Sequence, residues 1–333
     1  MDGDNQLSRS ETIAQAGGRS THRPPLSARL QQDLAARRTF AAITLLPVFL
    51  ILLIMVALTV RSWPVIRSHS LVDTIFGVIW KPEEGSFGFW PFIMGTTWVT
   101  VVGVVLSVPA CILVALYLSE YAQGAVRSIA KPVLDLLAAI PPVVYGVWGL
   151  LAIVPFVQGF VAPLAARWLN GVPLLHVHQP TGFTILTGGI VLAVMIAPLI
   201  ISVVYEILSA VPNDLRHASL AVGATRWQTI RNVVLPQVLP GIVAAVVLGA
   251  SRALGETIAV LMVVGNVAKV PTSIFDAAYP LPALIANNYG DMMSIPLYDA
   301  ALLGAALVLL LVILFFNVVS TLVLQRMLRR KWS

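Results

Sequence analysis

The sequence predicts an all-α membrane protein that crosses the bilayer about six times. Only 11% of its 333 residues are charged, against roughly 25% in an ordinary soluble domain, and 58% are hydrophobic. This scarcity of charge excludes a cytosolic enzyme and, for most of the chain, intrinsic disorder. The apolar residues form long unbroken runs of about 20, which is the length of a transmembrane helix, whereas barrel strands alternate polar and apolar residues over ~10.

Six apolar runs are long enough to span a bilayer. They are Phe40–Val60, Phe92–Leu118, Val133–Val157, Phe183–Leu208, Val238–Val264 and Ala300–Leu324. The third run contains Pro141 and Pro142, so we expect a kinked helix, which neighbouring helices and waters make tolerable in a membrane. We interpret residues 40–91 as the first span with its outer loop, and residues 92–325 as a core domain of five spans.

Lysine and arginine are divided unevenly between two sets of segments. Fifteen of the 21 lie in the two terminal tails and in loops 119–132 and 209–237, whereas the alternating loops hold five. By the positive-inside rule, both termini are cytoplasmic. The net charge of +6 is then a signal of topology rather than of nucleic-acid binding. We expect a disordered cytoplasmic tail over residues 1–39 and a basic cytoplasmic tail over residues 326–333.

The sequence offers little for metal, redox or nucleotide chemistry. Cys111 is the single cysteine and lies in an apolar run, which excludes disulfides and cysteine-based zinc or redox sites within this chain. His176 and His178 share an outer loop but have no third ligand close in sequence. No Gly-x-x-x-x-Gly-Lys-Ser/Thr motif is present, and the nearest run, residues 249–257, has Glu256 where a phosphate-binding lysine would stand. Any nucleotide chemistry is therefore expected on a partner.

The remaining charges near the spans are expected at the membrane interfaces. Lys131 and Asp135 have the i,i+4 spacing of a solvated helix pair at the cytoplasmic end of the third span. Glu120, Glu206 and Asp299 lie near predicted helix ends.

Residues 211–236 predict a helix–glycine–helix elbow on the cytoplasmic side, between the fourth and fifth spans. Pro212-Asn213-Asp214 is typical of a helix start, where an acidic residue complements the positive end of the helix dipole. We expect a short helix over about Leu215–Val222, ended by Gly223, which is free to take a positive φ. A second amphipathic helix, Thr225–Val234, then leads into the fifth span.

The spacing of Ala218, Gly223 and Leu235-Pro236 resembles the EAA loop of ABC importer permeases. In that family the loop places a coupling helix in a cleft of a cytoplasmic ATPase, so the resemblance implies a type I ABC importer permease fold. His217 stands where the motif usually has Glu, and Ser219 replaces its second Ala; Arg216 or Arg226 are candidates for the polar contacts instead. The implied coupling residues are Arg216, His217, Ala218, Ala221, Gly223, Ala224, Arg226, Leu235 and Pro236.

Arg252 and Glu256 lie inside an otherwise apolar stretch, where an arginine costs ~2.5–3.5 kcal/mol on insertion scales. On a continuous helix their i,i+4 spacing places both on one face, which they share with the small residues Gly241, Ala245, Gly249 and Ala253. Small residues let another helix approach closely, so we predict a narrow polar pathway at a helix–helix interface. The alternative is a pair that only neutralises itself, although arginine before glutamate is the less favourable order.

The run Arg252–Asn266 resembles the phosphate branch of these permeases, the PstC type, as do Phe92–Thr97 and Ile140–Gly149. In that branch the arginine and glutamate of this segment are implicated in phosphate passage, which implies a translocation site at Arg252 and Glu256, to which we add Thr257. A guanidinium offers forked donors to phosphate oxygens. A carboxylate accepts a hydrogen bond from protonated phosphate, and fully ionised sulfate has no proton to donate.

The resemblance also implies an assembly in a bacterial or archaeal inner membrane. Its members are a second homologous permease, two ATP-binding subunits that hold ATP and Mg, and an external phosphate-binding protein. This chain is then a permease without a cofactor and not an enzyme. Two alternatives remain: the same machine for another oxyanion or small solute, and an ATP-independent ion-coupled carrier or channel. The latter leaves the elbow unexplained and lacks an evident inverted repeat. A membrane enzyme is disfavoured because no His-Glu-x-x-His or Gly-x-Ser-x-Gly motif is present.

Overall fold

A computed structural model of the chain describes residues 26–68, 70–168, 171–178, 180–290, 295 and 297–330. The chain divides into two compact units, Met1–Val56 and Ala57–Ser333. Six helical segments of the described residues are long and apolar enough to cross a membrane, which confirms the predicted number of spans. They are Asp33–Ser68, Trp90–Tyr121, Pro142–Trp168, Ile185–Ser209, Arg226–Leu254 and Tyr298–Leu328. The domain boundaries expected at residues 39, 91 and 325 stay predictions.

The described part of the first unit belongs to one helix, α2 (Leu26–Ser68), which continues into the second unit. The expected disorder of residues 1–39 is therefore wrong for residues 26–39, and residues 1–25 lie outside the described residues. The reason is the abundance of Ala, Leu, Arg and Gln in this stretch, which are strong helix formers. From Phe40 onward most of the apolar side chains of α2 are exposed, as suits contact with lipid.

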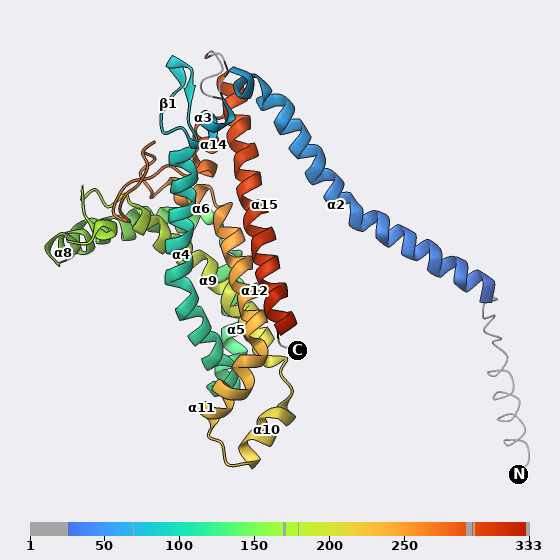
Figure 1. Cartoon of the computed structure of the whole chain (residues 1–333). Coiled ribbons are helices and arrows are strands. Elements are labelled where there is room, and N and C mark those ends of the chain that lie inside the picture. Colours follow the sequence, from blue (N-terminus) through green and yellow to red (C-terminus); the bar gives the residue numbers. More distant parts are fainter. Residues whose placement is uncertain are drawn as a thin grey trace, which may run out of the picture. The chain divides into compact units, whose positions relative to one another are not determined.

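One end of the second unit is built around aromatic side chains. The end of α2 is followed by α3 (Leu71–Phe76) and by an antiparallel hairpin of β1 (Trp80–Lys81) and β2 (Ser86–Phe87), joined by a 3-10 turn over Pro82–Glu84. The ring of Trp80 packs against four aromatic rings: Phe87, Phe89, Phe92 and Tyr298. Leu281 and Leu284 of α14 (Leu281–Asn288) complete this core. Figure 1 shows β1, α3 and α14 gathered at this end.

A helical bundle carries the rest of the second unit. The helix α4 (Trp90–Leu116), extended by a π-helical turn over Tyr117–Tyr121, packs along α9 (Ile185–Ser209), and α12 (Leu235–Leu254) packs against both. The last helix, α15 (Tyr298–Arg330), lies along α12 and α14 (Figure 1). Side chains of α4, α9 and α12 form the main buried core, in which Cys111 is buried as its apolar context predicts.

The third span differs from its prediction. Residues 133–139 belong to a separate helix, α5 (Gly124–Ala139), and the chain leaves the helix at Ile140 and Pro141, whose ψ angles are 129° and 139°. The spanning segment starts only at Pro142 and combines α6 (Pro142–Trp148), α7 (Val154–Phe156) and α8 (Ala162–Trp168) with π-helical turns over Gly149–Ile153 and Val157–Val161. It extends away from the bundle to the left of Figure 1. The predicted span Val133–Val157 is wrong because two consecutive prolines, Pro141 and Pro142, each disfavour the helical region for the residue before them.

The fifth span also ends earlier than predicted. Two short helices, α10 (Asn213–Ala221) and α11 (Arg226–Thr229), lie at the end of the bundle opposite the hairpin (Figure 1). A π-helical turn over Ile230–Val234 joins α11 to α12, which stops at Leu254. A separate single turn, α13 (Ile258–Leu261), follows, so the predicted helix Val238–Val264 is interrupted at residues 255–257.

Candidate functional site

The predicted elbow between the fourth and fifth spans is confirmed. Its first helix, α10, begins at Asn213, two residues earlier than expected, and Gly223 follows with φ +88°. Thr225 caps the second helix: its Oγ1 accepts from the Gln228 N–H at 3.3 Å, while Gln228 Oε1 accepts from the Thr225 N–H at 2.8 Å. This reciprocal capping fixes the exit from the elbow. Helical structure then continues without a stop through Leu235, which packs on the main core, and the exposed Pro236.

Arg216 is committed to contacts within the chain. Its Nη2 donates to Glu120 Oε1 at 2.9 Å and to the carbonyl of Leu208 at 2.8 Å, and its Nη1 donates to the carbonyl of Val211. The side chains of Arg216 and Glu120 are only 16% and 11% exposed. The contact of Arg216 to an ATPase stays a prediction, since the donors of Arg216 are occupied within the chain in this structure.

Most of the other predicted coupling residues of the elbow are exposed. His217, Ala218, Ala221 and Arg226 are exposed, and Ala224 is half-buried. Three apolar side chains of the elbow that the sequence reasoning missed are also exposed: Leu220, Val222 and Trp227 are 41%, 86% and 55% exposed. Clustered apolar exposure on a polar loop is typical of a protein-binding surface.

Ser219, which stands at the second alanine position of the EAA motif, joins the two arms of the elbow. Its hydroxyl lies 2.9 Å from the hydroxyl of Thr229, close to a cavity of about 180 Å³. That cavity is lined by Glu120, Asn213, Arg216, His217, Leu220, Arg226, Thr229 and Ile230. The departure from the motif at Ser219 thus has a structural role, since an alanine could not make this bond.

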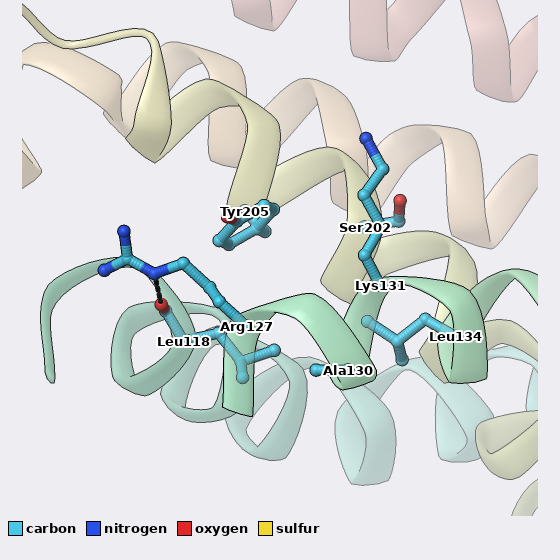
Figure 2. Close-up of a pocket in the computed structure, with 7 residues that line it drawn as sticks. All are labelled: Leu118, Arg127, Ala130, Lys131, Leu134, Ser202 and Tyr205. Carbon is cyan, nitrogen blue, oxygen red and sulfur yellow. Dashed lines mark hydrogen bonds between the residues drawn. The ribbon is translucent and has the colours of Figure 1, made fainter. Parts of the chain in front are cut away.

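The neighbouring end of α4 is held by α5. Arg127 Nε donates to the carbonyl of Leu118 at 2.9 Å, and its Nη2 donates to that of Ser119 at 2.6 Å. Figure 2 shows Arg127 reaching back to Leu118 beside a small hollow, which Tyr205 of α9 also lines. The predicted pair of Lys131 with Asp135 is wrong, because Lys131 Nζ lies 3.4 Å from Glu206 Oε1 on α9.

Arg252, Glu256 and Thr257 flank the break in the fifth span. Arg252 is exposed in the last turn of α12, while half-buried Glu256 and Thr257 lie in the link to α13. Glu256 Oε1 accepts from the Ala259 N–H at 3.3 Å, and Thr257 Oγ1 donates to the Gly255 carbonyl at 3.3 Å. Such local side-chain bonds offer the backbone an alternative to the continuous helix.

The prediction that Arg252 and Glu256 lie on one face of one helix is therefore wrong. No ion pair joins them among the residues that the structure describes. Glu256 instead caps the turn that follows the break. The self-neutralising pair, the alternative weighed from the sequence, is not seen either.

The small residues of α12 do admit a close neighbour, but that neighbour is apolar. A Cβ at Gly249 would lie 2.7 Å from Ile200 Cδ1, and one at Gly241 would lie 2.8 Å from Ile207 Cγ2. Both isoleucines belong to α9, so the small face of α12 is an internal packing surface. The prediction that this face lines a polar pathway is wrong, and Arg252 lies outside the contact.

Two polar residues that sequence reasoning missed, Asn317 and Tyr145, make hydrogen bonds between neighbouring helices. Ser251 donates to Asn317 Oδ1 of α15 at 2.8 Å, and the buried Tyr145 of α6 carries a hydroxyl. That hydroxyl donates to the carbonyl of Leu137 at 2.8 Å, across the break between α5 and α6. Asn317 interrupts an apolar run, which is the signal that a search for intramembrane polar residues would have found.

The two loop histidines, His176 and His178, belong to a contact between loops. His178 Nδ1 lies 2.9 Å from Asp276 Oδ1, and the rings of His176 and His178 are 4.6 Å apart. Within the described ranges, no group of three His, Cys, Asp or Glu side chains is placed to hold a metal ion.

Comparisons with known proteins give the family. A model described as "Binding-protein-dependent transport system inner membrane component" matches residues 107–331. The phosphate transport system permease protein PstC of Mesorhizobium japonicum is 31% identical over 311 residues, which are 90% of this chain and 94% of that protein. The protein of the same name from Haemophilus influenzae is 31% identical over 301 residues, 89% of this chain and 94% of that one.

A solved structure resembles the fold. In the crystal structure of a bacterial ABC transporter involved in the import of the acidic polysaccharide alginate, one chain aligns with a TM-score of 0.50 and 18% identity. The alignment covers 88% of this chain and 98% of that chain. This chain thus has the importer permease fold that its spans and elbow predict, and it belongs to the family of binding-protein-dependent transport system inner membrane components.

Proposed function

We propose that this chain is the transmembrane permease subunit of an ATP-driven importer of inorganic phosphate. The observation that supports the proposal most strongly is its 31% identity, over nine-tenths of its length, to permeases of phosphate transport systems. The Arg252 region adds a chemical reason, because it brings a permanent positive charge into the membrane-spanning part of the chain.

The position of Arg252 points to a pathway rather than to lipid. An exposed arginine at this depth is costly against hydrocarbon, so the exposed side of Arg252 faces a water-filled pathway or another subunit. A guanidinium binds phosphate oxygens through forked donors. Glu256 and Thr257, four and five residues further on, supply a carboxylate and a hydroxyl near the break. In this proposal Glu256 accepts the proton-bearing oxygen of phosphate and disfavours fully ionised oxyanions.

The elbow is proposed to meet the ATPase. The distribution of lysine and arginine assigns it to the cytoplasm together with both termini. Its exposed face then offers Ala218, Ala221 and Val222 to a cytoplasmic partner. The proposed assembly comprises a second homologous permease, two ATP-binding subunits that hydrolyse ATP, and an external phosphate-binding protein, in the inner membrane of a bacterium or archaeon.

The proposed mechanism is alternating access. ATP binding closes the partner ATPases, which move the elbow, and the spans rock until the pathway opens outward to the loaded binding protein. Phosphate then passes to the region of Arg252, and ATP hydrolysis restores the inward-facing state. This chain provides the pathway and receives the movement, while the nucleotide chemistry stays on the partner.

The test is uptake of labelled phosphate into liposomes that contain the complete complex. Arg252→Gln should lower ATP-dependent uptake about tenfold or more, because a hydrogen bond to a charged group contributes about 1.5–3 kcal/mol. Glu256→Gln should reduce the preference for phosphate over sulfate. Lys131→Gln is the control. It removes an exposed cation of α5, outside the helix that carries Arg252, and should leave uptake unchanged.

Two results would count against the proposal. Uptake that does not require ATP would favour a carrier or channel. ATPase stimulation by another solute, but not by phosphate, would assign the chain a different substrate. Unchanged selectivity in Glu256→Gln would remove the proposed role of that carboxylate alone.

A further inference from the structure

We propose that the ion pair of Arg216 and Glu120 transmits the movement of α10 to the second span. Both are positioning residues, since neither touches a transported solute. The inference rests on the proposed function, because it presumes that an ATPase moves α10. It assigns a role to Glu120, which lies outside the elbow and outside the EAA-like sequence.

One guanidinium connects three elements at this point. Arg216 extends from α10 and binds both carboxylate oxygens of Glu120, Nη2 to Oε1 at 2.9 Å and Nε to Oε2 at 3.4 Å. The same side chain donates to the carbonyls of Leu208 and Val211 at the end of α9. Carbonyls at a helix C-terminus lack intrahelical partners and attract cations, so Arg216 also caps α9.

Because the ion pair of Arg216 and Glu120 is largely buried, it is suited to transmit movement between helices. Its side chains are 16% and 11% exposed, whereas those of Lys131 and Glu206, the other cation–carboxylate pair at this end, are 55% and 60% exposed. An exposed pair contributes little because water screens it and its side chains remain mobile. A largely buried, forked pair holds its geometry, because breaking it leaves an uncompensated charge.

Glu120 is itself part of a fixed structure. It follows Leu118 and Ser119, whose carbonyls accept from Arg127 of α5. Figure 2 shows the bond to Leu118. Two arginines from two different helices therefore hold the three residues at the end of the second span. A displacement of α10 that pulls on Glu120 moves the end of α4, and α5 with it.

No other described hydrogen bond or ion pair links α10 to this end of α4. The remaining side-chain link of α10 is the bond of Ser219 to Thr229, which leads towards the fifth span instead. Along the backbone, α10 is separated from α9 by residues 210–212 and from α11 by the turn at Gly223. Without the pair, movement of α10 would reach the second span only through packing.

The experiment measures the amount of phosphate imported per ATP hydrolysed. Complexes that carry Glu120→Gln, Arg216→Gln, or both changes would be reconstituted with the ATPase and binding protein. Glu206→Gln is the matched control, because it breaks an exposed pair at the same end without touching α10. Cross-linking of a cysteine at position 221 to the ATPase reports whether the elbow still docks.

In Glu120→Gln, the cross-link and ATP hydrolysis should persist while phosphate imported per ATP falls about fivefold or more, the lower range for coupling between sites. The double variant should lose no more than Arg216→Gln alone, since two residues that act as one unit are not additive. Glu206→Gln should match the unaltered complex.

Unchanged coupling in Glu120→Gln would overturn the inference, as would additive losses in the double variant. Loss of the cross-link in both single variants would assign the pair to folding or docking and also overturn it. Failure of the proposed function is distinguishable, because it would appear in the unaltered complex as an absence of ATP-dependent phosphate uptake.

Discussion

Asp276 shows how a single carboxylate holds together two loop segments that are distant in sequence. Its Oδ2 accepts from the N–H and hydroxyl of Thr272 and from the N–H of Ser273, and its Oδ1 faces His178. Burial raises the pKa of Asp276, but these hydrogen bonds to the charged form outweigh it, and the pKa lies below its ordinary value. The carboxylate is therefore more stable in the folded chain than in the unfolded chain.

The sign of this pKa shift predicts a pH dependence. A carboxyl with a depressed pKa contributes its full stability above the unfolded value of about 3.9, and this contribution is lost as the pH falls through the folded pKa. Asp276→Asn should lower the Tm of the purified chain by about 1–2 °C at pH 7, as expected for a loss near 1 kcal/mol in a chain of 333 residues. The difference from the unaltered chain should shrink below pH ~4.

Thermal unfolding between pH 7 and pH 3 checks this prediction. Glu83→Gln, which alters an exposed carboxylate, is the control and should not change the Tm at either pH. A difference between Asp276→Asn and the unaltered chain that is independent of pH would contradict the electrostatic account.

Long-range residue contacts were beyond prediction from the sequence. Arg216 lies 96 positions from Glu120, and His178 lies 98 positions from Asp276. The sequence marks Arg216 only as a cation on the elbow. Its pairing with Glu120 depends on how close the end of the second span lies to the end of the fourth, and a local sequence pattern does not contain that distance.

At the scale of elements, hydropathy predicted where apolar runs lie but not where helices end. The run Val133–Val157 is apolar on both sides of Pro141, so composition alone does not show the break between α5 and α6. The stretch after Leu254 is likewise apolar enough to be predicted as one helix, whereas the structure shows a break at which Glu256 and Thr257 make local hydrogen bonds. The elbow was predicted better because its turn and capping signals are local.

Gly223 provides a test of the elbow as an element. Its φ of +88° is a conformation that costs a residue with a Cβ about 1–2 kcal/mol, and no atom within 4 Å would meet that Cβ. Gly223→Ala should therefore act through the backbone alone. Hydrogen exchange of the α10 amides should accelerate by about 5- to 30-fold, as this free energy implies.

Two variants make the comparison specific. Gly124→Ala introduces a Cβ that also meets no neighbouring atom, but at an ordinary φ, and should leave exchange in α10 unaltered. Gly223→Asn should cost less than Gly223→Ala, because asparagine tolerates left-handed backbone. Equal exchange in Gly223→Ala and the unaltered chain would show that the elbow does not depend on this turn.

At the scale of the whole molecule, the elbow and the aromatic hairpin lie at opposite ends of the second unit (Figure 1). The uneven distribution of lysine and arginine predicts that the elbow end is cytoplasmic. A cysteine at position 221, which is exposed on α10, should therefore cross-link to an ATP-binding subunit in at least one nucleotide state. A cysteine at position 125, which is exposed on α5 and is not part of the elbow, should not.

Absence of the position-221 cross-link in every nucleotide state of a verified complex would argue against the coupling role of the elbow. The overall architecture of six spans with a polar elbow needed only composition and periodicity, since the bilayer imposes both. The assembly that surrounds it is not encoded in local pattern, because a subunit interface in a membrane looks as apolar as a lipid-facing surface.

The helical run from Arg226 to Leu254 has a mechanical consequence. Its 29 residues rise 1.5 Å each, so it forms a rod about 40 Å long that starts at the elbow and carries Arg252 near its other end. If this rod pivots near the elbow by about 5°, its far end sweeps roughly 3–4 Å, since that arc is the length multiplied by the angle. This displacement is larger than the increase in donor–acceptor distance that breaks a good hydrogen bond. A slight tilt, without any bending, is thus enough to present the guanidinium to an anion or withdraw it.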